Sequence, residues 1–408
     1  MKIKIIRSVI AIMLAVVMTL GLSVSAPKTA HAEYLCCHDY LEELGGFIVS
    51  FEGLMDTFGE LMELFEHLEN EDEITEWVEA FNTLYEAVSE TVNIMTDNIS
   101  NAPEQYLEAH ITLVLAMGYV YNVFTSFEYA VTAYADGDED AFIGELLNYI
   151  IYIDEAAKIW ENALAEFYLI FINDFVNVFT ELMDYVGELL EGMEYVEDED
   201  SLLDWAINYV IFQDLLEQIK DDMNLHQYIV PEKYKVSHMY FGFLLETVYK
   251  AIGNLFGALE EYLVGDEEAF LDGLIEFLEM LIDAGEYWEK AVEIIYADLM
   301  SKVIQNFETA MELIDDLILN YDEGWFELIG VITEYVRDIR TDITFLYDFV
   351  PYDLLDAHEI KVLALTMVID ALIEFEESMS AGEDNDCCLD ELYNQMMVAA
   401  VLWLGAQE

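Results

Sequence analysis

The segment APEQYLEAH (Ala102–His110) recurs as VPEKYKVSH (Val230–His238) and, in altered form, as VPYDLLDAH (Val350–His358). A tryptophan precedes each segment with one spacing, Trp-x25-Pro-x6-His, and the first two copies are 128 positions apart. Self-similarity at a long fixed period is typical of tandem repeats. The repeated signature residues are Trp77, Pro103, His110, Trp205, Pro231, His238, Trp325, Pro351 and His358.

The repeat extends well beyond this segment. FEGLMDTFGELMELFEHL (Phe51–Leu68) aligns with Phe179–Val196 at nine identical positions in 18, and FETAMELIDDL (Phe307–Leu317) supplies a third copy. We therefore expect three repeats after an N-terminal leader. Their expected bounds are residues 33–163, 164–291 and 292–408.

The periodicity of each copy is helical. Apolar residues recur every three or four positions, and only four prolines occur in 408 residues. The sequence predicts an all-α fold of three tandem repeats of about 120–128 residues, each an antiparallel four-helix bundle. Nothing breaks a helix from Glu139 to Val196 or from Glu267 to about Asn320, which predicts long helices shared between successive repeats.

The N-terminus has the pattern of a secretory signal peptide. Basic MKIKIIRS is followed by an apolar run and then by APKTAHA, which predicts cleavage after Ala32. The expected location is secreted or extracellular, at the cell surface or in a periplasm. An uncleaved membrane anchor is the alternative, because the apolar run approaches the length that spans a bilayer.

The chain is strongly acidic, with a formal net charge of −70. Residues 1–32 hold four of the 14 Lys and Arg and none of the 84 Asp and Glu, so cleavage changes this charge to −74. No Lys or Arg occurs from Glu33 to Ala157. Nucleic acid is excluded as a partner because binding phosphates requires clustered cations. Cations, basic proteins or polycations are the expected partners, and the 55% hydrophobic content indicates a folded chain.

The cysteines form two adjacent pairs, Cys36-Cys37 and Cys387-Cys388. An exported protein permits disulfides, and four cysteines allow three pairings. We expect links between the pairs or between molecules, the latter giving disulfide-linked self-association. Free or partly buried thiols are the alternative.

The repeated proline is expected to begin a helix, since it lacks the N–H that a first turn does not need. Tyr106 and His110 are four residues apart on one helical face, which predicts a tyrosine–histidine contact against a neighbouring helix. A metal or small-ligand carrier using His110, His238 and His358 is the alternative. The Glu-x-x-His motif of bundle metal sites is absent, so no metal site is assigned.

The tryptophans are expected in the core, because an indole buries a large apolar area. Asp138, in the acidic turn before Glu139, is expected to cap a helix. Calcium binding by such turns is the alternative reading, and weak divalent-cation association by the whole surface requires no designed site. No resident cofactor is expected.

One helix, residues 111–135, carries a single charge at Glu128. A helix that is apolar all round suits the centre of a bundle, although this one is long enough to cross a membrane. Signatures of hydrolases, phosphate loops and metalloproteases are absent from the sequence. The expectation is a non-enzymatic scaffold or interaction module. A membrane-active or pore-forming protein and a histidine-based carrier are the alternatives, and membrane association is not expected once the leader is removed.

Overall fold

A computed structural model describes residues 38–65, 71–193, 199–319, 325–351, 354–381 and 385–406. Every regular element in these residues is helical, as predicted, and they contain no strand. The predicted signal peptide, Cys36, Cys37 and the side chains of Trp325 and Cys387 lie outside the described residues. The α-helices of the described part are α3 (His38–Phe65), α4 (Glu71–Asn98), α5 (Leu107–Asp136), α6 (Glu139–Met193), α7 (Glu199–Leu225), α8 (Lys235–Val264), α9 (Glu267–Leu319), α10 (Trp325–Phe345), α11 (Leu355–Ser380) and α12 (Asn385–Gly405).

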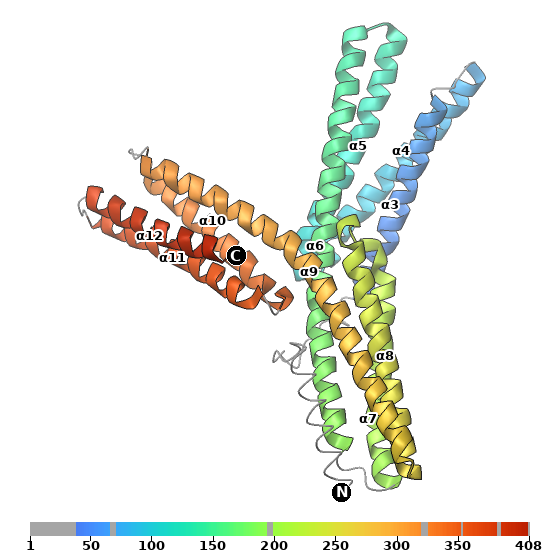
Figure 1. Ribbon diagram of the computed structural model, residues 1–408. Helices are drawn as coiled ribbons and strands as arrows, with labels where there is room; N and C mark the ends of the chain where they lie inside the picture. Colours follow the sequence, from blue (N-terminus) through green and yellow to red (C-terminus); the bar gives the residue numbers. More distant parts are fainter. Residues whose placement is uncertain are drawn as a thin grey trace. The chain divides into compact units, whose positions relative to one another are not determined.

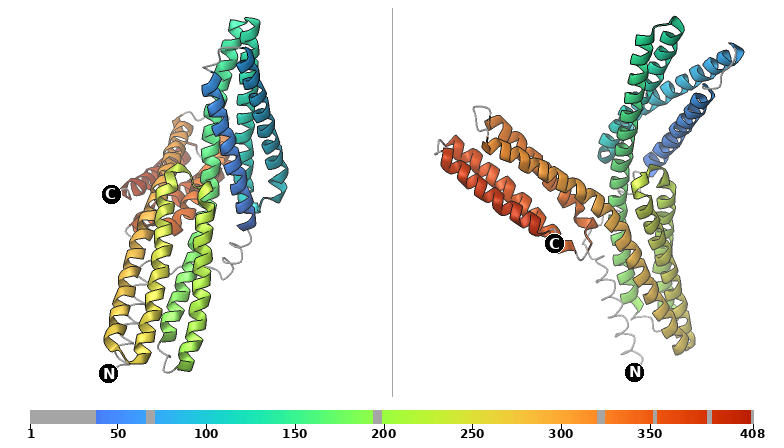
Figure 2. Two further views of the ribbon diagram at one scale, coloured as in Figure 1. Left: turned by 90° about the vertical axis from the view of Figure 1, so that its right-hand side faces the viewer. Right: turned by 45° about the horizontal axis from the view of Figure 1, so that its top comes forward.

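The chain divides into two compact units. The first contains residues up to His238 together with Leu245–Leu281, and the second contains Met239–Leu244 and Ile282–Glu408. Within the first unit, α5 and α6 lie side by side (Figure 1). Within the second unit, α11 packs against both α10 and α12 (Figure 2). The division between the units passes through both α8 and α9.

Two helices are much longer than the rest. α6 has 55 residues and α9 has 53, and each is continuous in the structure. This agrees with the absence of helix-breaking residues in both stretches. Their equivalent starts, Glu139 and Glu267, are 128 positions apart and follow identical corners.

Each of these corners uses a glycine and an aspartate. Gly137 has φ +74° and Gly265 has φ +86°, the left-handed conformation that a residue without a Cβ adopts at no steric cost. The next residue caps the following helix, because Asp138 Oδ1 accepts from the Ala141 N–H at 3.0 Å and Asp266 Oδ1 accepts from the Ala269 N–H at 3.1 Å. The predicted capping role of Asp138 is confirmed.

The proline corners differ from the prediction. Pro103 does not begin a long helix, because a 3-10 turn (Glu104–Tyr106) intervenes and α5 begins at Leu107. The Tyr106 N–H donates to the Pro103 carbonyl at 2.9 Å, which closes this tighter turn. Ala102, the residue before the proline, is extended at φ −65° and ψ 130°, because the proline ring disfavours the α-helical region for its predecessor.

α5 is less buried than a central bundle helix. Leu115 is 53% exposed, Tyr129 57% and Tyr134 72%. By length and composition, Glu104–Tyr134 and Glu139–Gly192 are both candidate membrane spans, and their most apolar windows are 39% and 67% buried. The expectation that residues 111–135 are apolar because they fill a bundle centre therefore accounts for only part of this helix.

Candidate functional site: an apolar groove between α3, α5 and α6

A cavity of about 470 Å³ lies in the first unit. It is a half-open groove between α3 on one side and α5 and α6 on the other. Its walls are almost entirely apolar. The lining residues are Phe51, Glu52, Met55, Phe58, Gly59, Met62, Val120, Val123, Phe124, Tyr149, Ile153, Ala156, Ala157 and Trp160.

Aromatic rings close the floor of the groove. Phe51 of α3 stacks on Trp160 of α6, with ring centroids 5.0 Å apart. Further along α3, Phe58 packs against Phe124 of α5 at 4.4 Å. Such ring pairs contribute about 0.5–1.5 kcal/mol beyond the area they bury, so they help to hold α3 against α6 and α5.

The groove has an acidic edge. On α3, Glu52, Asp56, Glu60 and Glu63 follow one another at spacings of four, four and three residues, and all four are exposed. Residues at these spacings share a helical face. Glu52 lines the groove, and the other three carboxylates continue from it along the neighbouring face of α3 for about three turns of helix.

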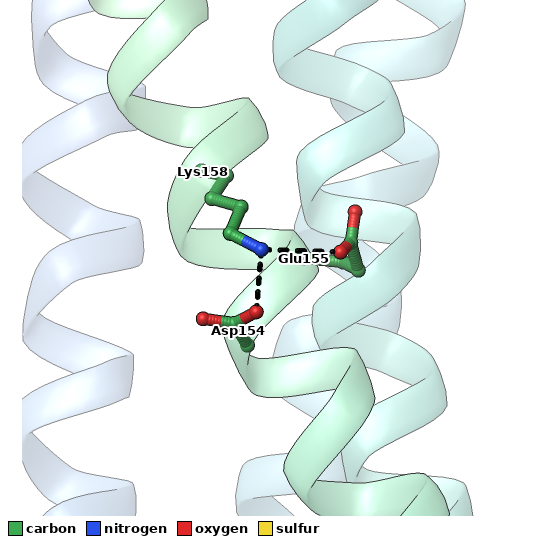
Figure 3. Close-up of polar contacts among 3 residues, drawn as sticks. All are labelled: Asp154, Glu155 and Lys158. Carbon is green, nitrogen blue, oxygen red and sulfur yellow. Dashed lines mark hydrogen bonds and ion pairs between the residues drawn. The ribbon is translucent and has the colours of Figure 1, made fainter.

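Lys158 is the first basic residue after position 32 and lies beside the groove on α6. Its Nζ is 2.6 Å from Asp154 Oδ2 and 3.4 Å from Glu155 Oε1 (Figure 3). The two carboxylates of its own helix hold this cation. They raise the pKa of the Lys158 ammonium through hydrogen bonds and charge attraction.

Glu52 belongs both to the row of carboxylates on α3 and to the lining of the groove. Partial burial raises the pKa of its carboxyl, and the nearby charge of Asp56 raises it further, while Lys235 acts in the opposite direction. Both causes disfavour a second negative charge at this point. The edge is thus best complemented by a cation.

In the second copy of the repeat, the positions equivalent to the groove lining lie in a closed core. Met183, Val186 and Leu190 correspond to Met55, Phe58 and Met62 at an offset of 128, and they are at most 1% exposed. By contrast, Met55 and Met62 are only partly buried. The groove is therefore a feature of the first copy.

Two contacts tie α8 to its neighbours in the second copy. A Cβ added at Gly273 of α9 would come within 2.8 Å of the Ala258 Cβ of α8, so these helices touch closely there. Lys220 of α7 forms an ion pair with Glu246 of α8. The first copy has Glu145 in place of Gly273, and its helices α4 and α5, the counterparts of α7 and α8, contain no Lys or Arg with which to form such a pair.

The repeated histidines form interhelical joints. His110 Nδ1 accepts from the Tyr40 hydroxyl of α3 at 2.8 Å, and its Nε2–H donates to the Met95 carbonyl of α4 at 2.9 Å. Both ring nitrogens of His110 are therefore engaged. Tyr106, the predicted partner, instead packs its ring on Tyr40 at 5.8 Å.

The other two copies repeat this joint with variations. The ring of Tyr168 lies 5.9 Å from His238, and the Tyr296 hydroxyl lies 3.4 Å from His358 Nδ1. Burial lowers the pKa of His238 to about 4. Burial also lowers the pKa of His358, and the nearby Lys361 lowers it further. The rings of His238 and His358 are neutral packing elements near pH 7.

Trp77 and Trp205 each form a hydrogen bond to the backbone near the end of the preceding helix. The Trp77 indole N–H donates to the Leu61 carbonyl at 2.6 Å, and the Trp205 indole N–H donates to the Leu189 carbonyl at 2.7 Å. Both side chains are buried, as predicted. Each indole adds a second donor to a carbonyl one turn before the end of the preceding helix, so these residues are structural.

A side-chain nitrogen also bonds a backbone carbonyl at a helix end in the second unit. Lys361 of α11 is 7% exposed and donates from Nζ to the Ala406 carbonyl, just after α12, at 3.1 Å. Burial lowers the pKa of this ammonium. Cys388 of α12 is buried, and the predicted disulfides remain predictions because the other three cysteine side chains lie outside the described residues.

The described part of the chain contains no group of three or more His, Cys, Asp and Glu side chains placed to hold a metal ion. The arrangement suits binding by shape and charge, with an apolar groove bordered by carboxylates. No family model matches the sequence, and no curated protein or solved structure matches it either.

Sequence reasoning missed two features. Tyr40, Tyr168 and Tyr296 are each 128 apart, so extending the repeat alignment would have shown the true partners of the histidines. No sequence pattern indicated the groove, because its lining residues in the first copy are as apolar as the equivalent buried residues in the second copy.

Proposed function

We propose that the chain is an exported, non-enzymatic interaction module that associates with cationic partners. We further propose that its three sequence repeats, residues 33–163, 164–291 and 292–408, are four-helix bundles joined through α6 and α9. In this view the helices form a scaffold, and the acidic surface is the part that partners meet.

The observation that best supports association with cationic partners is the distribution of charge. From Glu33 to Ala157 the chain has no Lys or Arg, so the helices α3, α4 and α5 carry many carboxylates and no cationic side chain of their own except histidine. Self-repulsion of this kind opposes folding. A basic protein, a polycation or a divalent cation would relieve it, and this relief supplies a driving force for association.

A direct test measures binding of labelled oligolysine to the processed full-length chain. We expect binding at low ionic strength that weakens steeply toward about 0.15 M NaCl, since salt screens exposed charges. Oligoglutamate serves as the matched control and is expected not to bind. Absence of oligolysine binding at low salt would overturn the proposal.

A separate thermal-unfolding series in CaCl2 and in NaCl of equal ionic strength distinguishes specific from general cation association. A larger increase in Tm with calcium indicates divalent capture by the carboxylates. Equal increases indicate screening alone.

A second candidate function is membrane activity, and one observation favours it. The apolar window of α5 is only 39% buried and has the length to span a bilayer. Leakage of dye from liposomes on addition of the processed chain would support this function. Intact liposomes across pH 4–8 would exclude it.

A further inference from the structure

We infer that the groove between α3, α5 and α6 binds the apolar face of a cationic amphipathic α-helix. The inference rests on the proposed function, and it names the site and the chemistry of the partner. Its observations are the apolar lining, the acidic edge and the closed counterpart in the second copy.

The closed counterpart shows that the repeat is able to fill this space from within. Met183 is 1% exposed, whereas the equivalent Met55 borders an open cavity of about 470 Å³. An open apolar groove of this size in water leaves hydrophobic area that a ligand would bury favourably. The groove is therefore a binding surface that the second copy lacks.

The lining matches helix-in-groove recognition. Met55 and Met62 stand on the α3 wall, and flexible methionines adapt to varied apolar partners. The wall from Phe51 to Met62 spans about 16 Å at 1.5 Å per residue. That length accommodates side chains at positions i, i+3 or i+4, and i+7 of a bound helix.

The charge selects the partner. The row Glu52, Asp56, Glu60 and Glu63 repeats at nearly one-turn intervals, so lysines or arginines at four-residue spacing on a bound helix would face it in register. Fatty acids and anionic lipids carry the wrong charge for this edge. A second copy of the chain, at −70, is repelled.

The test uses two labelled peptides of about 18 residues, long enough for about five helical turns. Both contain the same leucines and lysines. One places the leucines on a single helical face, and the other scrambles them. Fluorescence anisotropy with the processed full-length chain measures each Kd. We expect the amphipathic peptide to bind about tenfold more tightly, because only it presents aligned apolar anchors.

Two variants locate the binding surface without changing charge. Ala157 is exposed and lines the groove, so Ala157→Phe fills it and is expected to abolish the difference between the peptides. Val264, 79% exposed at the end of α8, gives the control Val264→Phe, which is expected to change neither Kd. Methyl NMR adds a second readout, in which Met55 shifts on binding and its equivalent Met183 does not.

The outcomes separate the two proposals. Equal binding of both peptides, unaffected by Ala157→Phe, overturns the groove inference and leaves general cation association standing. No binding of either peptide overturns both. Binding of an uncharged apolar dye that the amphipathic peptide does not displace assigns the groove to a small apolar ligand and also overturns the inference.

Discussion

The first and second copies of the repeat place apolar residues at the same positions and bury them to different extents. Met62 is part-exposed at the groove, whereas Leu190, 128 residues later, is fully buried. An apolar pattern is therefore compatible with either a core or a binding surface. The difference lies in whether the surrounding helices are held together.

Small residues and opposite charges distinguish the two copies. The second copy has Gly273 against Ala258 and an ion pair between Lys220 and Glu246. The first copy has a glutamate at the glycine position and no cation on α3, α4 or α5. Repulsion among its carboxylates adds to the effect.

The largest expected effect on stability comes from introducing a glutamate at position 62 of the first copy or at its equivalent, position 190 of the second copy. Leu190→Glu should lower the free energy of unfolding by about 4 kcal/mol or more, because it buries an unpaired charge. Met62→Glu should lower it by about 1 kcal/mol or less, because the side chain reaches water. Urea denaturation of the full chain measures both. Equal losses would show that the two copies are equally closed.

An intermediate effect is expected from His238. Its pKa is about 4 in the folded chain and 6.5 when unfolded. Below pH 6.5 the unfolded state therefore binds a proton that the folded state does not. This contribution to stability is fully present above pH 6.5 and is lost as pH falls toward 4, by about 3 kcal/mol at most.

His238→Gln keeps a neutral amide and removes the titration. Denaturation of both proteins between pH 7 and pH 4 should show the parent losing stability relative to the variant as pH falls. Carboxylate titration affects both proteins alike and cancels in the difference. A difference that does not vary with pH would contradict the buried neutral histidine.

The smallest expected effect concerns the feature that the two copies share. Trp77→Phe and Trp205→Phe each remove the indole N–H that donates to a carbonyl near the end of the preceding helix, at Leu61 and Leu189. Each should lower the free energy of unfolding by about 0.5–1.5 kcal/mol, since the carbonyl keeps its donor within the helix. Thermal or urea unfolding measures the change. A clearly smaller loss for Trp77 than for Trp205 would mean that the joint itself is weaker in the open copy.

Much of the fold was predictable from local chemistry. The absence of prolines predicted the continuous α6 and α9, and the acidic turn at Asp138 predicted where α6 begins. The proline corner was predicted less well, because a 3-10 turn and an α-helical turn differ by a single hydrogen-bond register that residue preferences do not resolve. The partner of His110 was missed because Tyr40 is 70 residues away in sequence.

The sequence by itself determined the helical class, the 128-residue repeat, the acidity and the buried role of Trp77 and Trp205. These depend on residue type and periodicity, which act over one or two turns. Tertiary structure alone decided that Met55 borders a groove and Met183 a core. That outcome depends on distances between helices, set by the balance of close contacts and charge repulsion over the whole first unit, and a linear pattern does not carry this balance.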